Sequence, residues 1–391
     1  MGAPHVTGHV GGPLAGLRVV DMATVVAGPG CARYLADFGA TVIKVERPDG
    51  GDTTRSMGFP DPGDPTGTSL WWKLLGRNKR SVVLDLKAPA DRDRLLGLLD
   101  GADVLIENLR PGALERLGLD PTDLLARNPR LVVTRVSGFG QDGPYAQRPG
   151  FATLAEAMSG FAAINGEPDG GPLLPPIALT DEVTDLAAAF ATMAAVHAGV
   201  GQVIDINLLE TMVQVMGQLP AAQAATGYLQ PRLGSGMPYT VPRGTWRCAD
   251  DRWVAVSTSH ETVARRVLDL LGLGDDEELR SFAGRVAARD RIDAAMAAWI
   301  GARTLDEVLD AFEAAEAAAA PVYDMADLAA DRHVAARQAL VEVDGVVQQG
   351  LVARLSATPG RVRHAGRALG ADQAILDAED PWAAAEAEAE L

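Results

Sequence analysis

An aspartate near the middle of the sequence, Asp181, has the surroundings of a candidate nucleophile. It follows the pair Pro175-Pro176, and a long apolar, alanine-rich helix is expected from about Asp181 to Ala198. Asp181 either caps this helix as an ordinary N-terminal carboxylate, or the helix dipole and free amides hold it ionised for attack on an electrophile. Asp185, one turn further on, is either a helper in this chemistry or a salt-bridge partner.

A set of lysines and arginines near the ends of apolar runs forms a second candidate site. If these runs are parallel strands, the cations gather at one edge of a sheet and favour a phosphate group. The alternative is that they are ordinary solvated surface charges. The cations concerned are Arg47, Lys79, Arg80, Lys87, Arg110 and Arg116.

Two glycine-containing loops are also candidates for ligand contact. The turn AGPG at residues 27–30 lets a ligand approach the backbone beside a helix N-terminus, but it lacks the full GxGxxG pattern of dinucleotide-binding enzymes. The loop GSGMP, with Gly234 and Gly236, is either a lid over an active site or a plain linker. No cysteine or histidine set has convincing ligand spacing, so we predict no metal site.

The composition excludes several classes of protein. The 391 residues carry a formal net charge of −17, whereas a nucleic-acid-binding protein needs a basic face. No apolar stretch is long enough to cross a membrane, and the N-terminal residues lack the basic and apolar segments of a signal peptide. Two cysteines are too few for a disulfide framework. We therefore expect a cytoplasmic protein with neither nucleic-acid nor membrane partners.

The first 140 residues alternate between short apolar runs and segments with helical spacing. This order predicts βαβ units with right-handed crossovers and hence a parallel, Rossmann-like α/β sheet. Such a sheet binds ligands beyond the carboxyl ends of its strands. The expected strands are residues 17–22, 41–45, 81–86, 102–107 and 131–136.

The rest of the chain predicts a second, smaller α+β domain. Two long apolar helices, 181–198 and 208–224, are expected to be buried in a core or in a subunit interface. A hairpin around residues 249–252 and several helices follow, and residues 314–320 are expected to be helical as well. The predicted parts are a flexible tail (1–13), a large Rossmann-like domain (14–225), a small α+β domain (226–330) and a return segment to the large domain with an acidic tail (331–391).

Five segments, in this order, resemble the class III CoA-transferases. This is the family of formyl-CoA transferase and carnitine CoA-transferase, and it also contains α-methylacyl-CoA racemases. The resemblance covers about residues 13–365, and it implies a Rossmann-like large domain, a small domain and two interlocked subunits of a homodimer. The segments are LRVVDMATVVAGPGCARYLADFGATVIKVERPDGGDTTR, NKRSVVLDLK, ADVLIENLRPGALERLGL, NPRLVVTRVSGFGQDGPY and PPIALTDEVTD.

The resemblance also implies roles for single residues. Asp181 matches the family's nucleophilic aspartate, which implies transfer of CoA from an acyl-CoA donor to a free carboxylic acid through an aspartyl mixed anhydride and an aspartyl-CoA thioester. The CoA thioester is then a substrate, and no tightly bound cofactor is implied. The residues that match CoA contacts are Val25, Arg47, Leu84, Lys87, Asn108, Leu109, Arg116 and Arg148.

Two alternative functions stay open from the sequence. An acyl-CoA racemase or isomerase would transfer a proton at the α-carbon, but Phe151 stands where the racemase branch has its histidine, so a second base is missing. A non-catalytic CoA-binding protein would have no need of Asp181. The formyl-CoA branch has a glutamine where this chain has Val26, and the sequence leaves the acyl donor and the acid open.

Overall fold

The computed structural model describes residues 11–387, and the chain divides into two compact units. The second unit consists of residues 160–174 and 217–332, and the first unit contains the remainder. Residues 160–174 lie in the second unit because they bond to the segment around Gly234, whose amide donates to the Gly166 carbonyl oxygen at 2.9 Å. The predicted limits had assigned these residues to the large domain. Most of the predicted tail, residues 1–13, lies outside the described residues.

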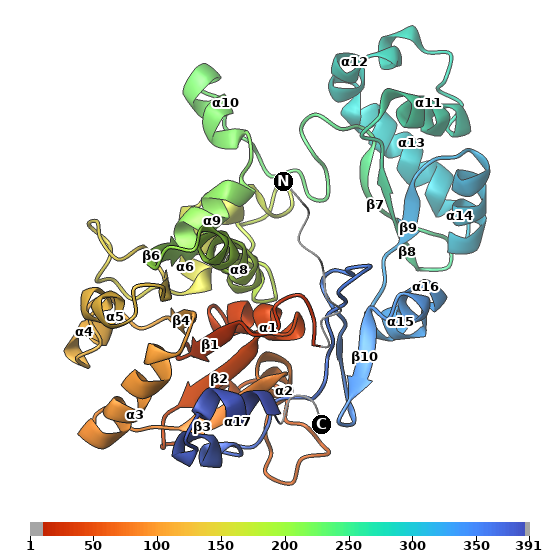
Figure 1. Ribbon diagram of the computed structural model, residues 1–391. Helices are drawn as coiled ribbons and strands as arrows, with labels where there is room; N and C mark the ends of the chain where they lie inside the picture. The colour runs from red at the N-terminus through yellow and green to blue at the C-terminus, as the bar shows by residue number, and fades with distance from the viewer. Residues whose placement is uncertain (1–10, 388–391) are drawn as a thin grey trace, which may run out of the picture. The chain divides into compact units, whose positions relative to one another are not determined.

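The first unit is built on a six-stranded parallel sheet with the strand order β3-β2-β1-β4-β5-β6. This is the Rossmann-like order, so the predicted parallel α/β sheet is confirmed (Figure 1). The inner strands are runs of buried apolar residues, as expected for a sheet that helices cover on both faces. The strands are β1 (Arg18–Asp21), β2 (Thr41–Glu46), β3 (Lys79–Val83), β4 (Val104–Glu107), β5 (Val132–Ser137) and β6 (Gln202–Asn207).

The edge strand β6 was missing from the prediction. It pairs with β5 in parallel, from Val132 opposite Gln202 to Ser137 opposite Asn207. Its sequence, QVIDIN, alternates so that Ile204 and Ile206 are less exposed than Val203 and Asp205. This alternation with a period of two is the signal of a half-buried strand. The strand has only six residues, however, and it lies between two long apolar segments. The hydrophobic pattern of those segments hides its short alternation.

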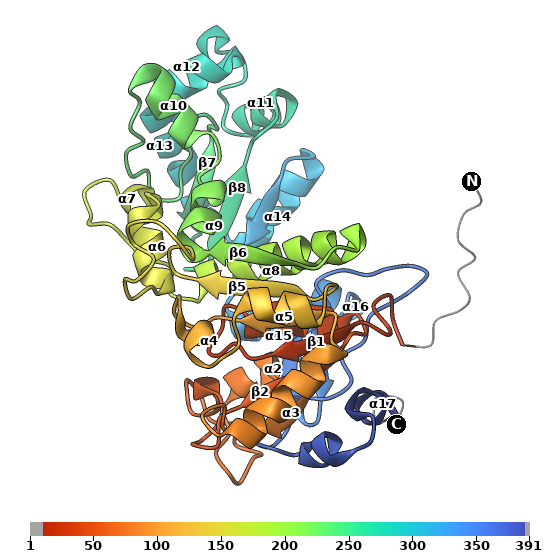
Figure 2. The same ribbon diagram turned by 60° about the vertical axis from the view of Figure 1, so that its left-hand side comes forward.

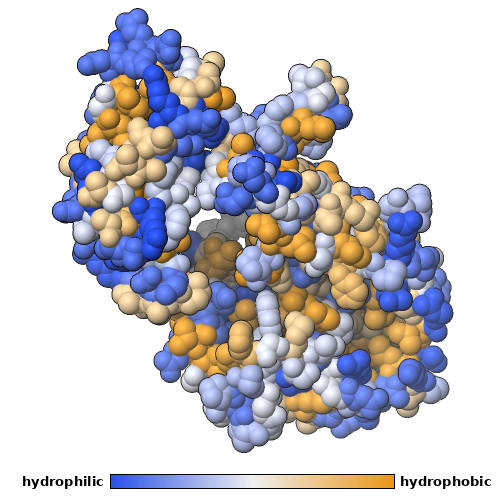
Figure 3. Space-filling model, turned by 180° about the vertical axis from the view of Figure 1, so that it is seen from behind, coloured by the Kyte–Doolittle hydropathy of each residue, from blue (hydrophilic) through white to orange (hydrophobic). Residues whose placement is uncertain are grey.

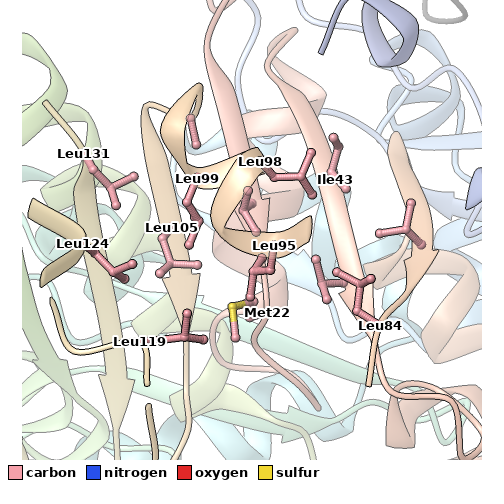
Figure 4. Close-up of a cluster of buried hydrophobic side chains, with 14 of the residues drawn as sticks. Met22, Ile43, Leu84, Leu95, Leu98, Leu99, Leu105, Leu119, Leu124 and Leu131 are labelled. Atoms are coloured by element: carbon pink, nitrogen blue, oxygen red, sulfur yellow. The ribbon is translucent and has the colours of Figure 1, made fainter. Parts of the chain in front are cut away.

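Helices cover both faces of this sheet (Figures 1 and 2). On one face, side chains such as Leu95, Leu98 and Leu124 pack against strand residues such as Leu105 in one hydrophobic core (Figure 4). Away from that core, α1 packs against α8, and α8 also contacts β5 and β6. The helices of the first unit are α1 (Pro29–Asp37), α2 (Leu70–Leu75), α3 (Pro89–Asp100), α4 (Ala113–Arg116), α5 (Pro121–Arg127), α6 (Ala152–Met158), α8 (Leu179–Ala198), α9 (Leu208–Val215) and α17 (Pro381–Ala387), with a hairpin of β10 (Leu340–Val343) and β11 (Val346–Gln349).

The second unit is a small α+β domain around a three-stranded antiparallel sheet. The predicted hairpin is present, and helices α11, α13 and α14 pack on it in a separate core. Residues 315–320 do not continue the helix as predicted, since α14 ends at Ala314 and Ala319–Pro321 pairs with the hairpin as β9. Its elements are α7 (Phe161–Ile164), α10 (Leu219–Thr226), β7 (Arg243–Arg247), β8 (Trp253–Ser257), α11 (Glu261–Leu270), α12 (Phe282–Ala287), α13 (Arg289–Gly301), α14 (Leu305–Ala314), β9 and α15 (Met325–Ala330); α16 (Arg332–Ala336) crosses the boundary between the units.

The two apolar helices are not buried in a core to the extent that their composition predicts. The second is broken into α9 and α10 at Gly217, which has φ +57°, and α10 has no buried residue. On α8, Phe190 is 78% exposed. Several hydrophobic patches separated by hydrophilic residues are also seen on the surface in Figure 3. Within residues 11–387, no helix is long and apolar enough to cross a membrane.

Candidate active site

A cavity of about 420 Å³ opens at the carboxyl ends of β1, β4 and β5. Parallel strands end at the same edge of their sheet, so the loops that follow them converge there. The structure brings together at this cavity the predicted nucleophile and four of the predicted CoA contacts. These residues are Asp181, Val25, Asn108, Leu109 and Arg148.

A second cavity, of about 310 Å³, adjoins the first at the ends of β1, β2 and β3. Arg47, Leu84 and Lys87 line it, and Thr24 and Leu109 line both cavities. Arg116 lines neither cavity, although its neighbour Leu117 lines the second. Two of the cations predicted from the sequence, Arg47 and Lys87, therefore line the same cavity.

Asp181 is the third residue of α8 and does not cap the helix. The N-cap is Ala178, and no side chain caps this end. Burial, together with the nearby carboxylates of Glu156 and Glu182, raises the pKa of Asp181 to about 6. The helix end therefore does not lower the pKa of this carboxyl group, but the group is still mostly ionised above about pH 6. Since a more basic oxygen is a better nucleophile, the surroundings favour attack by Asp181.

The two acidic neighbours of Asp181 are both held by hydrogen bonds of their own. Glu156 is buried on α6 and accepts a hydrogen bond of 2.9 Å from the Thr180 hydroxyl. Glu182 accepts bonds of 3.1 Å from both the Arg33 guanidinium and the Tyr34 hydroxyl. Neither Glu156 nor Glu182 was singled out from the sequence. Glu182 is the next residue along α8, whereas the proximity of Glu156 depends on the packing of α6 against α8, which no local pattern reveals.

Asp185 is not a salt-bridge partner. It is fully buried, and its Oδ1 accepts hydrogen bonds from the backbone amides of Gly28 at 2.6 Å and Cys31 at 2.8 Å. It therefore caps the start of α1 from the neighbouring helix. Burial raises the pKa of Asp185 well above its usual range. Asp185 therefore supports the AGPG turn. Ala27 of this turn lines the cavity that contains Asp181.

Two of the predicted cations are structural. Lys79 and Arg80 are buried because β3 begins at Lys79, two residues before the predicted strand. The Lys79 ammonium lies 2.8 Å from the Asp21 carboxylate and donates to the Pro29 carbonyl oxygen at 2.6 Å. These partners leave Lys79 no role at a phosphate. By contrast, Arg47, Lys87, Arg110, Arg116 and Arg148 are exposed.

The glycines of the predicted lid line a different hollow. Gly234 and Gly236 border a cavity of about 810 Å³ in the second unit, together with the hairpin β7–β8. The Arg243 guanidinium ties this loop down by donating to the carbonyl oxygens of Ser235 at 2.7 Å and Gly236 at 3.1 Å. Among the residues that the structure describes, no group of side chains is suited to hold a metal ion.

The strand order and the paired cavities define a doubly wound α/β protein with a ligand site at the carboxyl edge of its sheet. The chain belongs to CoA-transferase family III, whose family model matches residues 14–373. This confirms the predicted family and the prediction of a CoA-transferase enzyme, so its substrates are CoA thioesters and carboxylic acids.

The chain aligns with CoA-transferases over nearly their whole length. The chain is 38% identical to the succinyl-CoA–L-malate CoA-transferase beta subunit of Chloroflexus aurantiacus, covering 92% of this chain and 91% of that one. It is 35% identical to the succinyl-CoA–D-citramalate CoA-transferase of the same organism, again over 92% and 91%. A crystal structure of a CaiB/BaiF family protein from Brucella suis superimposes with a TM-score of 0.83 at 31% identity, covering 94% and 99% of the two chains.

Proposed function

We propose that the enzyme moves CoA from an acyl-CoA donor to a free carboxylic acid through covalent intermediates on Asp181. The observation that carries this proposal is the position of Asp181. Its half-buried carboxylate, with a raised pKa, lines a cavity that adjoins a second cavity bordered by Arg47 and Lys87. A thioester in the first cavity would then be attached to a nucleotide in the second.

The proposed reaction begins when an Asp181 oxygen attacks the thioester carbonyl, and the C–S bond breaks to release CoA thiolate. The resulting aspartyl–acyl mixed anhydride is attacked at the aspartyl carbonyl by that thiolate, which forms an aspartyl-CoA thioester and frees the donor acid. The incoming carboxylate attacks this thioester and releases the thiolate again. The thiolate then attacks the acyl carbonyl of the new anhydride, which yields the new acyl-CoA and restores Asp181. Water must be excluded because the anhydrides hydrolyse.

The predicted CoA contacts fit this division of the site. We infer that Arg47 and Lys87 bind the phosphates in the second cavity, since guanidinium and ammonium groups pair with phosphate. Leu84 lines the same cavity, and Leu109 lines both. Val25 and Asn108 line the first cavity together with Asp181, and so does Arg148, whose guanidinium is stacked on Tyr145. Arg116 is proposed as an outer contact.

Three further assignments belong to this proposal. An interlocked homodimer would cover the apolar side chains that α8 exposes, with Phe190 foremost. Gly234 and Gly236 are proposed as a lid, which is supported by their place in a cavity wall and by the left-handed φ of +54° at Gly234. A cytoplasmic location is supported by Cys31 and Cys248, which are both free thiols.

The acid is proposed to be a dicarboxylate, as in the two relatives named for malate and citramalate. One carboxylate would react at Asp181, and Arg110 in the same cavity would hold the other. We expect Arg110→Ala to raise the KM for a dicarboxylic acceptor about tenfold or more, with kcat nearly unchanged. The KM for a monocarboxylic acid of the same length should stay constant. Arg130→Ala, an exposed arginine remote from both cavities, is the matched control. Equal effects on both acids would contradict the assignment.

The pKa of Asp181 predicts the pH dependence. The carboxylate attacks only when ionised, so kcat should fall about tenfold per pH unit below about pH 6 and level off above it. The neighbouring carboxylates raise this pKa, so Glu156→Gln should move the acid limb to lower pH. Steady-state rates between about pH 5 and 8 test this. If Glu156→Gln leaves the acid limb of the pH profile at the same pH, a group other than Asp181 controls that limb.

The proposed activity is tested with a panel of acyl-CoAs and free acids. The enzyme is incubated with each pair, and new acyl-CoA is measured by chromatography and mass spectrometry. Succinyl-CoA with malate is the first pair to try because of the named relatives. New acyl-CoA without net hydrolysis supports the proposal. Exchange of the α-proton with solvent in the absence of any acid acceptor would favour proton-transfer chemistry.

A further inference from the structure

The turn after β1 holds one residue in an unusual backbone conformation. Val25 has φ +69°, and it is the only β-branched residue among the described non-glycine residues with positive φ. Bulky β-branched side chains rarely adopt this left-handed region, and such outliers persist only where the surroundings enforce them. Val25 is 38% exposed and lines the Asp181 cavity. The enforced conformation therefore shapes the wall of the reaction site.

A buried carboxylate, Asp52, holds Val25 in this conformation. Its Oδ1 accepts the Val25 amide at 3.2 Å, and also the Thr54 amide and hydroxyl at 2.9 and 2.8 Å. Its Oδ2 lies 3.1 Å from the Lys44 ammonium, which also donates to the Ala23 carbonyl oxygen. Asp52 and Lys44 are 3% and 1% exposed. The ion pair therefore bonds to the turn on both sides of Thr24, at Ala23 and at Val25.

The side chain of Asn108 also holds this turn through hydrogen bonds to its backbone. The Asn108 side chain accepts the Thr24 amide at 2.9 Å and donates to the carbonyl oxygens of Thr24 at 2.6 Å and Ala27 at 2.8 Å. With Asn108 and Asp52 in place, the backbone from residue 24 to 27 cannot shift without breaking several hydrogen bonds. A fixed turn is useful where reacting atoms must be placed within about 1 Å.

The ion pair also belongs to the wall of the second cavity. Lys44 and Asp52 line that cavity, whereas Val25, which Asp52 holds, lines the cavity with Asp181. An ion pair so deeply buried contributes little net stability, because desolvation offsets the attraction between the charges. Since it lines one cavity and bonds a residue of the other, we assign it a different use.

We propose that the Asp52–Lys44 pair is a positioning device that holds Val25 in its left-handed conformation and so presents the bound thioester to Asp181. This proposal rests on the proposed function. Asp52 and Lys44 are positioning residues, since they act through the backbone of the turn and touch no reacting atom. The pair then affects the chemical step more than the binding of CoA.

A double-mutant cycle between Asp52 and Val25 tests this proposal. Asp52→Asn keeps the shape and loses the ion pair, and it should lower kcat about 10- to 100-fold while the KM for acyl-CoA changes less than about threefold. Val25→Gly lets the backbone adopt positive φ without strain. Whatever activity Val25→Gly retains, adding Asp52→Asn to it should cost less than about threefold more. An equal cost of Asp52→Asn in both backgrounds would overturn the proposal, as would an unchanged kcat in the single variant.

Controls separate this proposal from general damage and from the proposed function. Asp64→Asn removes another aspartate–lysine pair, Asp64 and Lys73 at 2.8 Å, which borders neither cavity, and kcat should not change. If Asp52→Asn does not fold, Thr54→Val takes its place in the same cycle, because it removes one hydrogen bond to Asp52. Slow covalent labelling of Asp181 in Asp52→Asn fits both proposals. Full activity of an enzyme without Asp181 would refute the proposed function, whatever the cycle gives.

Discussion

Asp181→Asn is expected to lower kcat for CoA transfer by about 10⁴-fold or more, because asparagine cannot form the anhydride or the enzyme-bound thioester. The affinity for free CoA, measured by calorimetry, should change less than about twofold, since the proposed phosphate contacts are Arg47 and Lys87 in the adjoining cavity. The variant should be at least as stable as the wild type. The raised pKa of Asp181 in the wild type means that the folded protein disfavours the charged carboxylate. The asparagine amide carries no charge and so avoids this cost.

The neighbouring acid provides the matched control for this variant. Glu182→Gln also removes one negative charge from the first turn of α8, but Glu182 is bonded to Arg33 and Tyr34. Its kcat should stay within about tenfold of the wild type. A comparable loss in Glu182→Gln would mean that local charge, and not the identity of the nucleophile, determines the rate. Substantial transfer by Asp181→Asn, with deamidation excluded by mass, would contradict the covalent mechanism.

Gly30→Ala is expected to destabilise the first unit strongly. A methyl group at Gly30 would lie 2.0 Å from Oδ2 and 2.5 Å from Cγ of Asp185. The carboxylate cannot move aside, because it is fully buried and caps α1 through Gly28 and Cys31. We expect the free energy of unfolding to fall by about 3 kcal/mol, measured by denaturant titration.

A second glycine tests whether this effect is specific. A methyl group at Gly97, inside α3, meets no atom within 4 Å. Gly97→Ala should therefore stabilise the protein by about 0.5–1 kcal/mol, because alanine is the better helix former. A Gly30→Ala protein as stable as Gly97→Ala would show that Asp185 does not hold the turn rigidly. The AGPG turn would then have another support.

The sheet of the first unit was largely predictable because its strands are local features. Runs such as 41–45 and 131–136 are apolar and bounded by turn residues, and they match β2 and β5 closely. The edge strand β6 could not be recognised in the same way, because one of its faces is exposed and it has only six residues. Likewise, the alanine-rich stretch after α14 has a strong helical propensity, yet pairing with β8 makes Ala319–Pro321 a strand.

The candidate site was predictable where residues follow strands in the sequence. Asn108 and Leu109 come directly after β4, and Arg47 directly after β2, so strand order alone brings them to one edge. The supporting contacts were not predictable in this way. Asp185 caps a turn that lies more than 150 residues earlier in the chain, and Asp52 bonds to Val25 from within a long loop. Such pairs follow from tertiary packing, which spacing along the chain does not encode.

The measurement that tests the central claim most directly follows oxygen from the acid to the enzyme. In the proposed reaction the acceptor leaves one of its carboxylate oxygens on Asp181 in every turnover. The enzyme is therefore run with an acid labelled with ¹⁸O in its carboxylate, digested, and fragmented by mass spectrometry. We expect the heavy isotope in Asp181 and none in Asp185, which is fully buried and lies in the same helix. Accumulation of labelled acyl-CoA while Asp181 keeps its ordinary oxygens would contradict the account.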